Sequence, residues 1–152
     1  MSNCGGKCQM SSFSGEHRYS IDGKNRLTIP SKILEQIDVE KEGKGFVITR
    51  GLDECLYMYT SGKWEELVPE IGKLDVRDEA SRFYQHYMLS KVHEVPECDQ
   101  QCRILIPPYM KELAKLEKKV VIVGMYERIE IWDEKTWDKH EAALTAAYKK
   151  PK

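Results

Sequence analysis

The sequence has no long hydrophobic run. Nowhere in its 152 residues does it approach the roughly 20 consecutive apolar residues that a transmembrane helix requires. Its N-terminus lacks the basic, apolar and small-residue order of a secretory signal peptide. We therefore expect a cytoplasmic protein with no membrane partner.

Neither sign of charge dominates. The 24 lysines and arginines are offset by 25 aspartates and glutamates, so the formal net charge is -1. This balance excludes a uniformly basic protein that coats nucleic acid through charge alone. If the chain binds DNA, its positive charge must be concentrated on one face. The length suits one domain of about 150 residues, or two interlocked halves.

The cysteines are odd in number. Five cysteines in a chain large enough to form its own core indicate reduced thiols rather than a disulfide framework. Two C-x3-C pairs stand far apart in the sequence, Cys4 with Cys8 and Cys98 with Cys102. Together with His86 and His93 they could form a zinc site, but nothing else in the sequence brings the two pairs together. We expect no metal.

Catalytic signatures are missing as well. There is no glycine-rich phosphate-binding loop, and none of the four histidines has a serine, cysteine or carboxylate at a recognisable catalytic spacing. A solvated strand edge and a helix N-terminus would explain the acidic residues Glu127, Glu130, Asp133 and Glu134. The sequence predicts no enzyme, no cofactor and no small-molecule substrate.

The sequence does contain an internal repeat with two copies. The segment DGKNRLTIP at residues 22–30 returns as DQQCRILIP at residues 99–107. Each copy is followed by a fourteen-residue segment that opens on Gly and closes on Trp, at residues 51–64 and 124–137. The period of about 75 residues is too long for a solenoid repeat. It indicates a duplicated small domain, or two halves of one pseudo-symmetric domain.

Each copy is predicted to run strand, strand, short helix, strand, strand. In the first copy, alternating runs at 18–21 and 26–29 flank a turn-rich tetrapeptide, which predicts a hairpin. Its other predicted elements are a helix over 32–37 capped by Ser31, a charged loop over 40–44, and strands over 46–49 and 55–59. The first copy is four residues longer than the second between motif and glycine, since Arg26 to Gly51 spans 25 positions and Arg103 to Gly124 spans 21.

Two helices are predicted between the copies, one over 64–74 that Pro69 kinks or splits, and one over 78–93. The second copy begins a helix at residues 107–108, because proline is favourable in a first turn. Strands over 120–123 and 128–132 follow, and then a last helix that Asp133 caps.

These elements predict a β-rich α+β fold in five segments. The segments are a flexible N-terminal extension over 1–12, a first half over 13–64, a helical bridge over 65–95, a second half over 96–137, and a C-terminal helix and tail over 138–152.

The aromatic residues could stack single-stranded nucleic acid. Their strand and helix spacing favours instead a place in the core or in a subunit interface for Tyr57, Tyr59, Trp64, Trp132 and Trp137.

The D-x-x-x-R part of each motif is suited to reading DNA. Arginine bound through two hydrogen bonds to guanine O6 and N7 is the most common specific contact in the major groove, and Arg26 and Arg103 are candidates for it. Asp22 and Asp99, four positions earlier, could hold each guanidinium in one pose before binding. Alternatively, each Asp–Arg pair is a surface ion pair that fixes a turn.

Phosphate contacts would come from other residues of the first motif. Lys24 at the tip of the turn and Arg18 on the neighbouring strand are suited to phosphate, which positions a protein without carrying sequence information. From residue 13 to residue 30 the three cations outnumber the two anions, giving a net charge of +1. Because this footprint is weak, we expect several copies to bind successive sites together.

Four segments together resemble the MraZ family: FSGE at 13–16, SIDGKNRLTIP at 20–30, D-x-x-x-RILIP at 99–107, and G-x-x-x-RIEIWD at 124–133. The resemblance covers residues 13–140. It implies a bacterial transcriptional regulator, generally a repressor of its own division and cell-wall gene cluster. It also implies two tandem, pseudo-symmetric AbrB-like halves that form a double-split, swapped-hairpin β-barrel with flanking helices, related to AbrB and MazE.

The resemblance implies partners as well. They are double-stranded promoter DNA with short G-rich direct repeats, contacted through the D-x-x-x-R arginines, and further copies of the chain in a homo-oligomeric ring. Such a protein would be cytoplasmic and associated with the nucleoid.

One position departs from the family's usual D-x-x-G-R pattern, because Asn25 and Cys102 stand where glycine is usual. Asparagine tolerates the left-handed conformation better than cysteine does. The second motif also has Gln100 and Gln101 where a lysine would help to hold phosphate. We therefore expect the first motif to contribute more to DNA binding than the second.

Two rival functions remain open at the level of sequence. One is a ring-forming scaffold whose exposed turns hold a protein partner and do not bind DNA. The other is a zinc- or redox-sensing regulator that uses Cys4, Cys8, Cys98 and Cys102.

Overall fold

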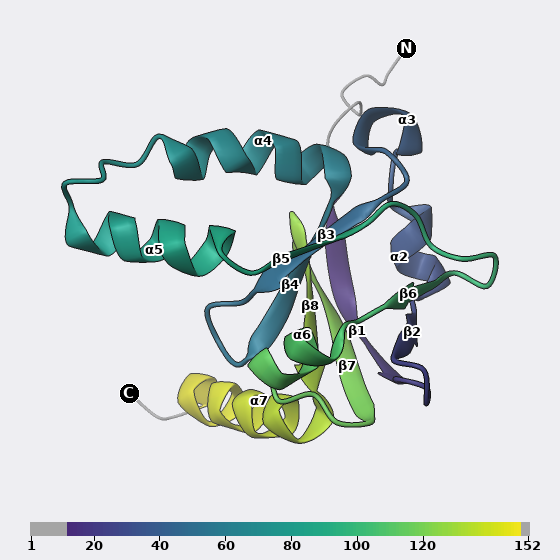
Figure 1. Cartoon of the computed structure of the whole chain (residues 1–152). Coiled ribbons are helices and arrows are strands. Elements are labelled where there is room, and N and C mark those ends of the chain that lie inside the picture. Colours follow the sequence, from purple (N-terminus) through teal and green to yellow (C-terminus); the bar gives the residue numbers. More distant parts are fainter. Residues whose placement is uncertain (1–11, 150–152) are drawn as a thin grey trace, which may run out of the picture.

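The computed structural model describes residues 12–149 (Figure 1). The predicted N-terminal extension lies outside this range except for Ser12, as do the last three residues of the predicted tail. In chain order the elements are β1 (Phe13–Ser20), β2 (Arg26–Thr28), α2 (Ser31–Glu35), α3 (Val39–Glu42), β3 (Phe46–Arg50), β4 (Cys55–Thr60), α4 (Ser61–Gly72), α5 (Glu79–Leu89), β5 (Val92–Val95), β6 (Arg103–Leu105), α6 (Pro108–Leu113), β7 (Lys119–Tyr126), β8 (Arg128–Asp133) and α7 (Glu134–Lys149).

The fold is β-rich α+β, as predicted, with eight strands and six helices over residues 12–149. Six strands form one antiparallel sheet in the order β1-β7-β8-β4-β3-β5, and β2 pairs with β6 in a separate two-stranded ribbon. No helix in the described range is long and apolar enough to cross a membrane.

The strand order of the sheet is symmetric with respect to the two copies of the repeat. The strands β1 to β4 of the first half correspond in order to β5 to β8 of the second, and replacing each strand by its counterpart reverses the sheet order. The two halves also exchange their first strands, because β1 pairs with β7 and β5 pairs with β3. The strands β1 and β5 are the two ends of the sheet, and no closed barrel is found over residues 12–149.

The prediction that the two strands at 18–29 pair with each other as a hairpin is wrong. The turn forms, but its two strands belong to different sheets, since β1 pairs with β7 and β2 with β6. Leu27 and Ile104 face each other at the centre of the β2–β6 ribbon and are 0% and 2% exposed. Pairing between the halves buries both side chains, which stabilises the fold by about 1.5–3 kcal/mol for each. A turn pattern in the local sequence does not indicate this burial.

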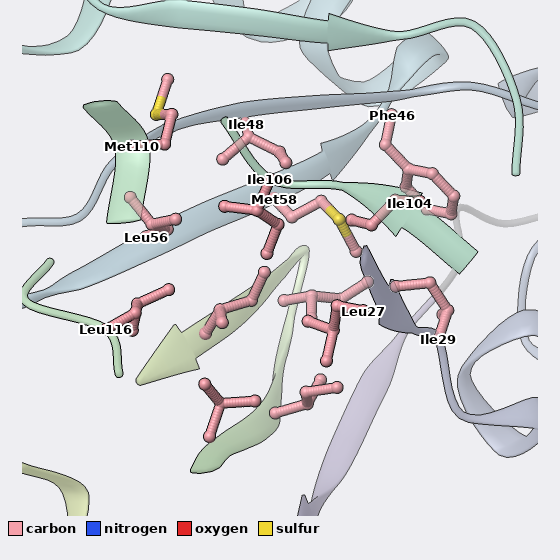
Figure 2. Packing of buried hydrophobic residues seen from close by; sticks show 14 of the residues in the cluster. Leu27, Ile29, Phe46, Ile48, Leu56, Met58, Ile104, Ile106, Met110 and Leu116 are labelled. Atoms are coloured by element: carbon pink, nitrogen blue, oxygen red, sulfur yellow. The ribbon is translucent and has the colours of Figure 1, made fainter. Parts of the chain in front are cut away.

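The main core lies between the β2–β6 ribbon and one face of the six-stranded sheet. Figure 2 shows side chains of the ribbon strands and the residues just after them meeting those of β3 and β4, among them Leu27, Ile29, Ile104, Ile106, Ile48 and Met58. Buried residues of α2 and α6, Ile33 and Met110, belong to the same cluster. The ribbon is therefore one wall of the core, and its other face is left for solvent or a partner.

A second cluster lies on the opposite face of the sheet. Tyr57, Tyr59, Trp132 and Trp137 are buried in it, and Trp64 packs against it at its edge. This confirms the prediction that these aromatic residues are core rather than stacking platforms. The helices α4 and α5 extend from the sheet together, while α7 lies on its own near the other end (Figure 1).

Several helix boundaries differ from the prediction. α2 begins after Pro30 and has no side-chain cap, whereas the predicted loop at 40–44 contains most of α3, which Asp38 caps by accepting the Glu40 N–H at 3.2 Å. Pro69 lies inside α4 without ending it. The helix predicted over 78–93 ends at Leu89, and β5 follows within the range 65–95 that was predicted as a helical bridge. Pairing with β3, distant in sequence, draws these residues into the sheet.

The acidic residues near the C-terminus are not all solvated, contrary to the prediction. Glu130 and Asp133 are 6% and 5% exposed. Glu130 pairs with Arg128 at 2.8 Å and accepts the indole N–H of Trp132 at 2.8 Å. Asp133 accepts the Glu117 N–H at 2.9 Å. A buried carboxylate is tolerated because it is paired and hydrogen-bonded.

Candidate nucleic-acid interface

The first D-x-x-x-R turn is organised by one aspartate. Asp22 Oδ1 accepts the backbone N–H groups of Lys24 and Arg26, both at 2.9 Å. The turn is closed by the Asn25 N–H, which donates to the Asp22 carbonyl at 3.0 Å. An aspartate side chain that accepts hydrogen bonds from backbone N–H groups two to four residues later stabilises a turn, so the local sequence favours this one.

The second turn repeats this arrangement. Asp99 Oδ1 accepts the N–H groups of Gln101 and Arg103, both at 2.9 Å, and the Cys102 N–H donates to the Asp99 carbonyl at 3.0 Å. The φ angle of Cys102 is 61°, against 63° for Asn25. Although cysteine is less suited to the left-handed region than asparagine or glycine, both backbones take the same path.

Each aspartate also holds the arginine of its own turn. Arg26 Nε lies 2.8 Å from Asp22 Oδ2, and Arg103 Nε lies 2.9 Å from Asp99 Oδ2. Arg103 Nη1 additionally approaches Asp22 Oδ2 at 3.9 Å, which links the two turns. Hydrogen bonds from the turn backbone, chiefly the N–H of Arg26, lower the pKa of Asp22, and those of the second turn lower the pKa of Asp99 in the same way. Both carboxylates are therefore ionised at neutral pH.

The ribbon presents both arginines on one surface. Arg26 lies directly opposite Leu105 and Thr28 directly opposite Arg103, so that all four alternate with the buried central pair and point away from the core. The arginine side chains are 33% and 25% exposed. The arrangement offers two oriented guanidinium groups on the outer face of a two-stranded ribbon.

A lysine that was not predicted from the sequence lies beside the first turn. Lys111, on α6 of the second half, donates from Nζ to Asn25 Oδ1 at 2.9 Å. A cavity of about 610 Å³ opens there, lined by Asn25, Pro108, Lys111, Glu112, Lys115, Leu116 and Glu117. The Ile21 N–H also donates to the Lys118 carbonyl at 2.8 Å, which brings the chain before β7 against the same turn. Lys111 is 86 positions from Asn25, so only the pairing of the two halves reveals it.

The corresponding place beside the second turn is mainly apolar, although Lys44 and Glu97 also line it. Leu34 of α2 occupies the repeat position of Lys111, four residues after the motif proline in each copy. A cavity of about 310 Å³ is lined there by Leu34, Ile37, Val39, Gly43, Lys44, Phe46, Glu97, Cys98 and Cys102. Burial raises the pKa of Cys98, so its thiol stays protonated.

Arg18 is not brought to either turn. Its guanidinium pairs with Glu16 and Asp138, both at 2.9 Å, and with Glu134 at 3.4 Å. These contacts, first among them the hydrogen bond to Asp138, raise the pKa of Arg18 and tie β1 to α7. Over residues 12–149, no hydrogen bond or ion pair joins Arg18 to the turns.

The residues considered for zinc are only partly described. Cys98 and Cys102 line one cavity, while Cys4 and Cys8 lie outside the described residues. Within the part of the chain that the structure covers, no group of three or more histidine, cysteine, aspartate or glutamate residues is placed to hold a metal ion.

Comparison with known proteins gives consistent relatives. The family model described as "MraZ protein, putative antitoxin-like" matches residues 12–86 and 88–151. The protein named Transcriptional regulator MraZ from Ligilactobacillus salivarius is 40% identical over 126 residues, covering 83% of this chain and 84% of the relative. Those from Pelotomaculum thermopropionicum and Desulforamulus reducens are 38% and 35% identical over 136 residues, covering 90% of this chain and 90% and 92% of the relatives.

Proposed function

The chain belongs to the MraZ family, and on that premise we propose that it regulates transcription by binding promoter DNA through the outer face of its β2–β6 ribbon. The observation that carries this proposal is the pair of arginines, Arg26 and Arg103, on one face of the ribbon, each held by an aspartate. The exchanged first strands support a relationship to the swapped-hairpin barrels, with the two halves of one chain in the place of two subunits.

The major groove is about 12 Å wide and admits a two-stranded β-ribbon, which is the form of the β2–β6 pair. An arginine bonded to guanine O6 and N7 discriminates against other bases by about 1–3 kcal/mol. Asp22 and Asp99 engage Nε of each arginine and limit its rotation before DNA arrives. Less side-chain entropy is then lost on binding.

Phosphate contacts would be made mainly at the first turn. Lys24 stands at its tip and Lys111 bonds Asn25, the residue before Arg26. The second turn has Gln100 and Gln101, and the mainly apolar cavity beside it is lined by one lysine, Lys44, and one glutamate, Glu97. Phosphate contacts of this kind fix register and orientation. Arg18 engages three carboxylates, so we expect the smallest contribution to binding from it.

A single ribbon with two arginines has modest affinity, and we propose that several copies in a ring bind short G-rich direct repeats together. Linking sites in this way raises affinity by about 10²- to 10⁴-fold when the spacing of copies matches that of the repeats. The regulated promoter would be that of the chain's own division and cell-wall gene cluster, with the protein as repressor. It would act in the cytoplasm, on the nucleoid.

The test is a fluorescence anisotropy titration with the DNA directly upstream of the protein's own gene and with a scrambled duplex of equal length. We expect tighter binding to the upstream DNA and an affinity that falls steeply with added salt, because phosphate contacts release counterions. Equal affinity for the two duplexes, or no binding to either, would contradict the proposal. It would favour the alternative of a scaffold whose turns hold a protein partner.

A further inference from the structure

Leu105 is the one large apolar side chain on the outer face of the ribbon. It lies directly opposite Arg26 and is 51% exposed, whereas its counterpart in the first half is the smaller, polar Thr28 opposite Arg103. An exposed leucine by itself is ordinary on a protein surface. This one lies directly opposite Arg26 and two residues after Arg103 on the same strand, so it adjoins both arginines of the proposed DNA interface.

Leu105 and the arginines share one concave surface. A cavity of about 390 Å³ is lined by Arg26 and Arg103 together with the apolar residues Leu105, Ile104, Val95 and Pro96, and also by His93 and the carboxylates Glu94, Glu97 and Asp99. The apolar side chain and the charged groups therefore face the same space. Whatever enters this space to meet Arg26 also meets Leu105.

The chemistry of the major groove leaves one match for such a side chain. Each base pair presents hydrogen-bond donors and acceptors there, and the only apolar group is the C5-methyl of thymine. Residues directly opposite on paired strands have Cβ atoms about 5 Å apart, and successive base pairs are about 3.4 Å apart. When Arg26 meets a guanine, Leu105 reaches a neighbouring base pair.

We propose that Leu105 is a specificity-determining residue that contacts the C5-methyl of a thymine next to the guanine read by Arg26. This inference rests on the proposed function and adds a second base to it. Thr28 stands at the equivalent place beside Arg103. A threonine methyl also contacts a thymine methyl, but it is smaller than a leucine side chain, so the preference is stronger on the Leu105 side of the ribbon.

The experiment is a uracil scan of the upstream duplex, measured by anisotropy with the full chain. Each thymine is replaced in turn by uracil, at the same position of every repeat, which removes the methyl and keeps all hydrogen-bonding groups. We expect one position at which the wild-type chain loses roughly fourfold in affinity per contact, the effect of one buried methyl. The chain with Leu105→Ala should lose a similar factor on the unmodified duplex and be indifferent to uracil at that position.

Leu144→Ala is the matched control, since Leu144 is a 41% exposed leucine on α7. It should bind like the wild type and keep the uracil effect. Circular dichroism and light scattering of Leu105→Ala should match those of the wild type. A loss of assembly would overturn the inference, because Leu105 would then hold copies of the chain together.

The remaining outcomes separate this inference from the function it rests on. If the wild-type chain binds the upstream duplex but no uracil weakens it, or if Leu105→Ala keeps the uracil effect, the inference fails and the proposed function stands. If Leu105→Ala does not fold, the absence of any uracil effect on the wild-type chain still overturns the inference. Failure of the wild-type chain to prefer the upstream duplex overturns both.

Discussion

The two D-x-x-x-R turns have the same backbone and different surroundings. Their aspartates make the same hydrogen bonds, and Asn25 and Cys102 take the same left-handed conformation. Beside the first turn, however, Lys111 donates to Asn25, and beside the second, Leu34 lines a mainly apolar cavity with Cys102. Duplication has kept the part that orients an arginine and has changed the part that sets the charge around it.

The sequence favoured the first turn for two reasons: cysteine fits a positive φ less well than asparagine does, and Gln100 and Gln101 stand in the second motif where a lysine would help to hold phosphate. The structure gives both turns one conformation, so the first reason does not separate them. The neighbours that each turn receives from the opposite half add a difference to that between Lys24 and the two glutamines.

The largest expected effect concerns what the two halves share. Leu27→Ala and Ile104→Ala each remove a fully buried side chain at the centre of the ribbon. Each should lower the free energy of unfolding by about 2–5 kcal/mol, through lost burial and the cavity left behind. Urea denaturation measures this. A large effect for one residue and none for the other would break the symmetry assigned to the ribbon.

The next effect concerns the charge beside the first turn. Lys111→Met keeps the aliphatic stem and removes the ammonium group that bonds Asn25. We expect DNA affinity to fall roughly 3- to 10-fold and the slope of log affinity against log salt to decrease by about 0.9, the change for one lost phosphate contact. Leu34→Met, at the same repeat position beside the second turn, is the matched control and should change neither quantity. Equal effects of the two substitutions would remove the distinction between the turns.

A smaller effect concerns the backbone of the turns. Cys102→Gly relieves a left-handed conformation at a cysteine and should stabilise the fold by about 0.5–1 kcal/mol. Asn25→Gly should gain less, because asparagine tolerates this region and the substitution loses the bond from Lys111. Thermal denaturation of both variants tests the order. A greater gain at Asn25 would contradict it.

The smallest expected effect is the loss of stability at acidic pH when the two turn aspartates are protonated. The folded-state pKa values of Asp22 and Asp99 are lowered from the ordinary 3.8, so their contribution to stability is present above that value. It is lost as the pH falls below 3.8 through the lowered folded values. NMR titration of the side-chain carboxyl carbons should give midpoints below 3.8 for both residues. A normal midpoint at one of them would show that its turn is not held as the other is.

Local chemistry made much of the site predictable. The aspartate that organises each turn, the arginine four positions later and the proline that precedes a helix all act within a few residues, so the sequence alone indicated them. The pairing of β2 with β6, the strand β5 and the position of Lys111 depend on contacts between the halves. Burial across such distances selects strand partners, and no local pattern encodes it. The buried Glu130 was missed for the same reason, because its strand β8 lies in the interior of the sheet.

The most direct measurement is one anisotropy titration of the upstream duplex with the wild-type chain, Arg26→Ala and Arg103→Ala, with light scattering of each protein to verify its assembly. We expect Arg26→Ala to lose at least about 100-fold in affinity, because a contact of up to about 3 kcal/mol is lost in every bound copy. Arg103→Ala should lose less, and assembly should be unchanged in both. Wild-type affinity in Arg26→Ala would contradict DNA reading by the ribbon, and a larger loss in Arg103→Ala would reverse the order of the two turns.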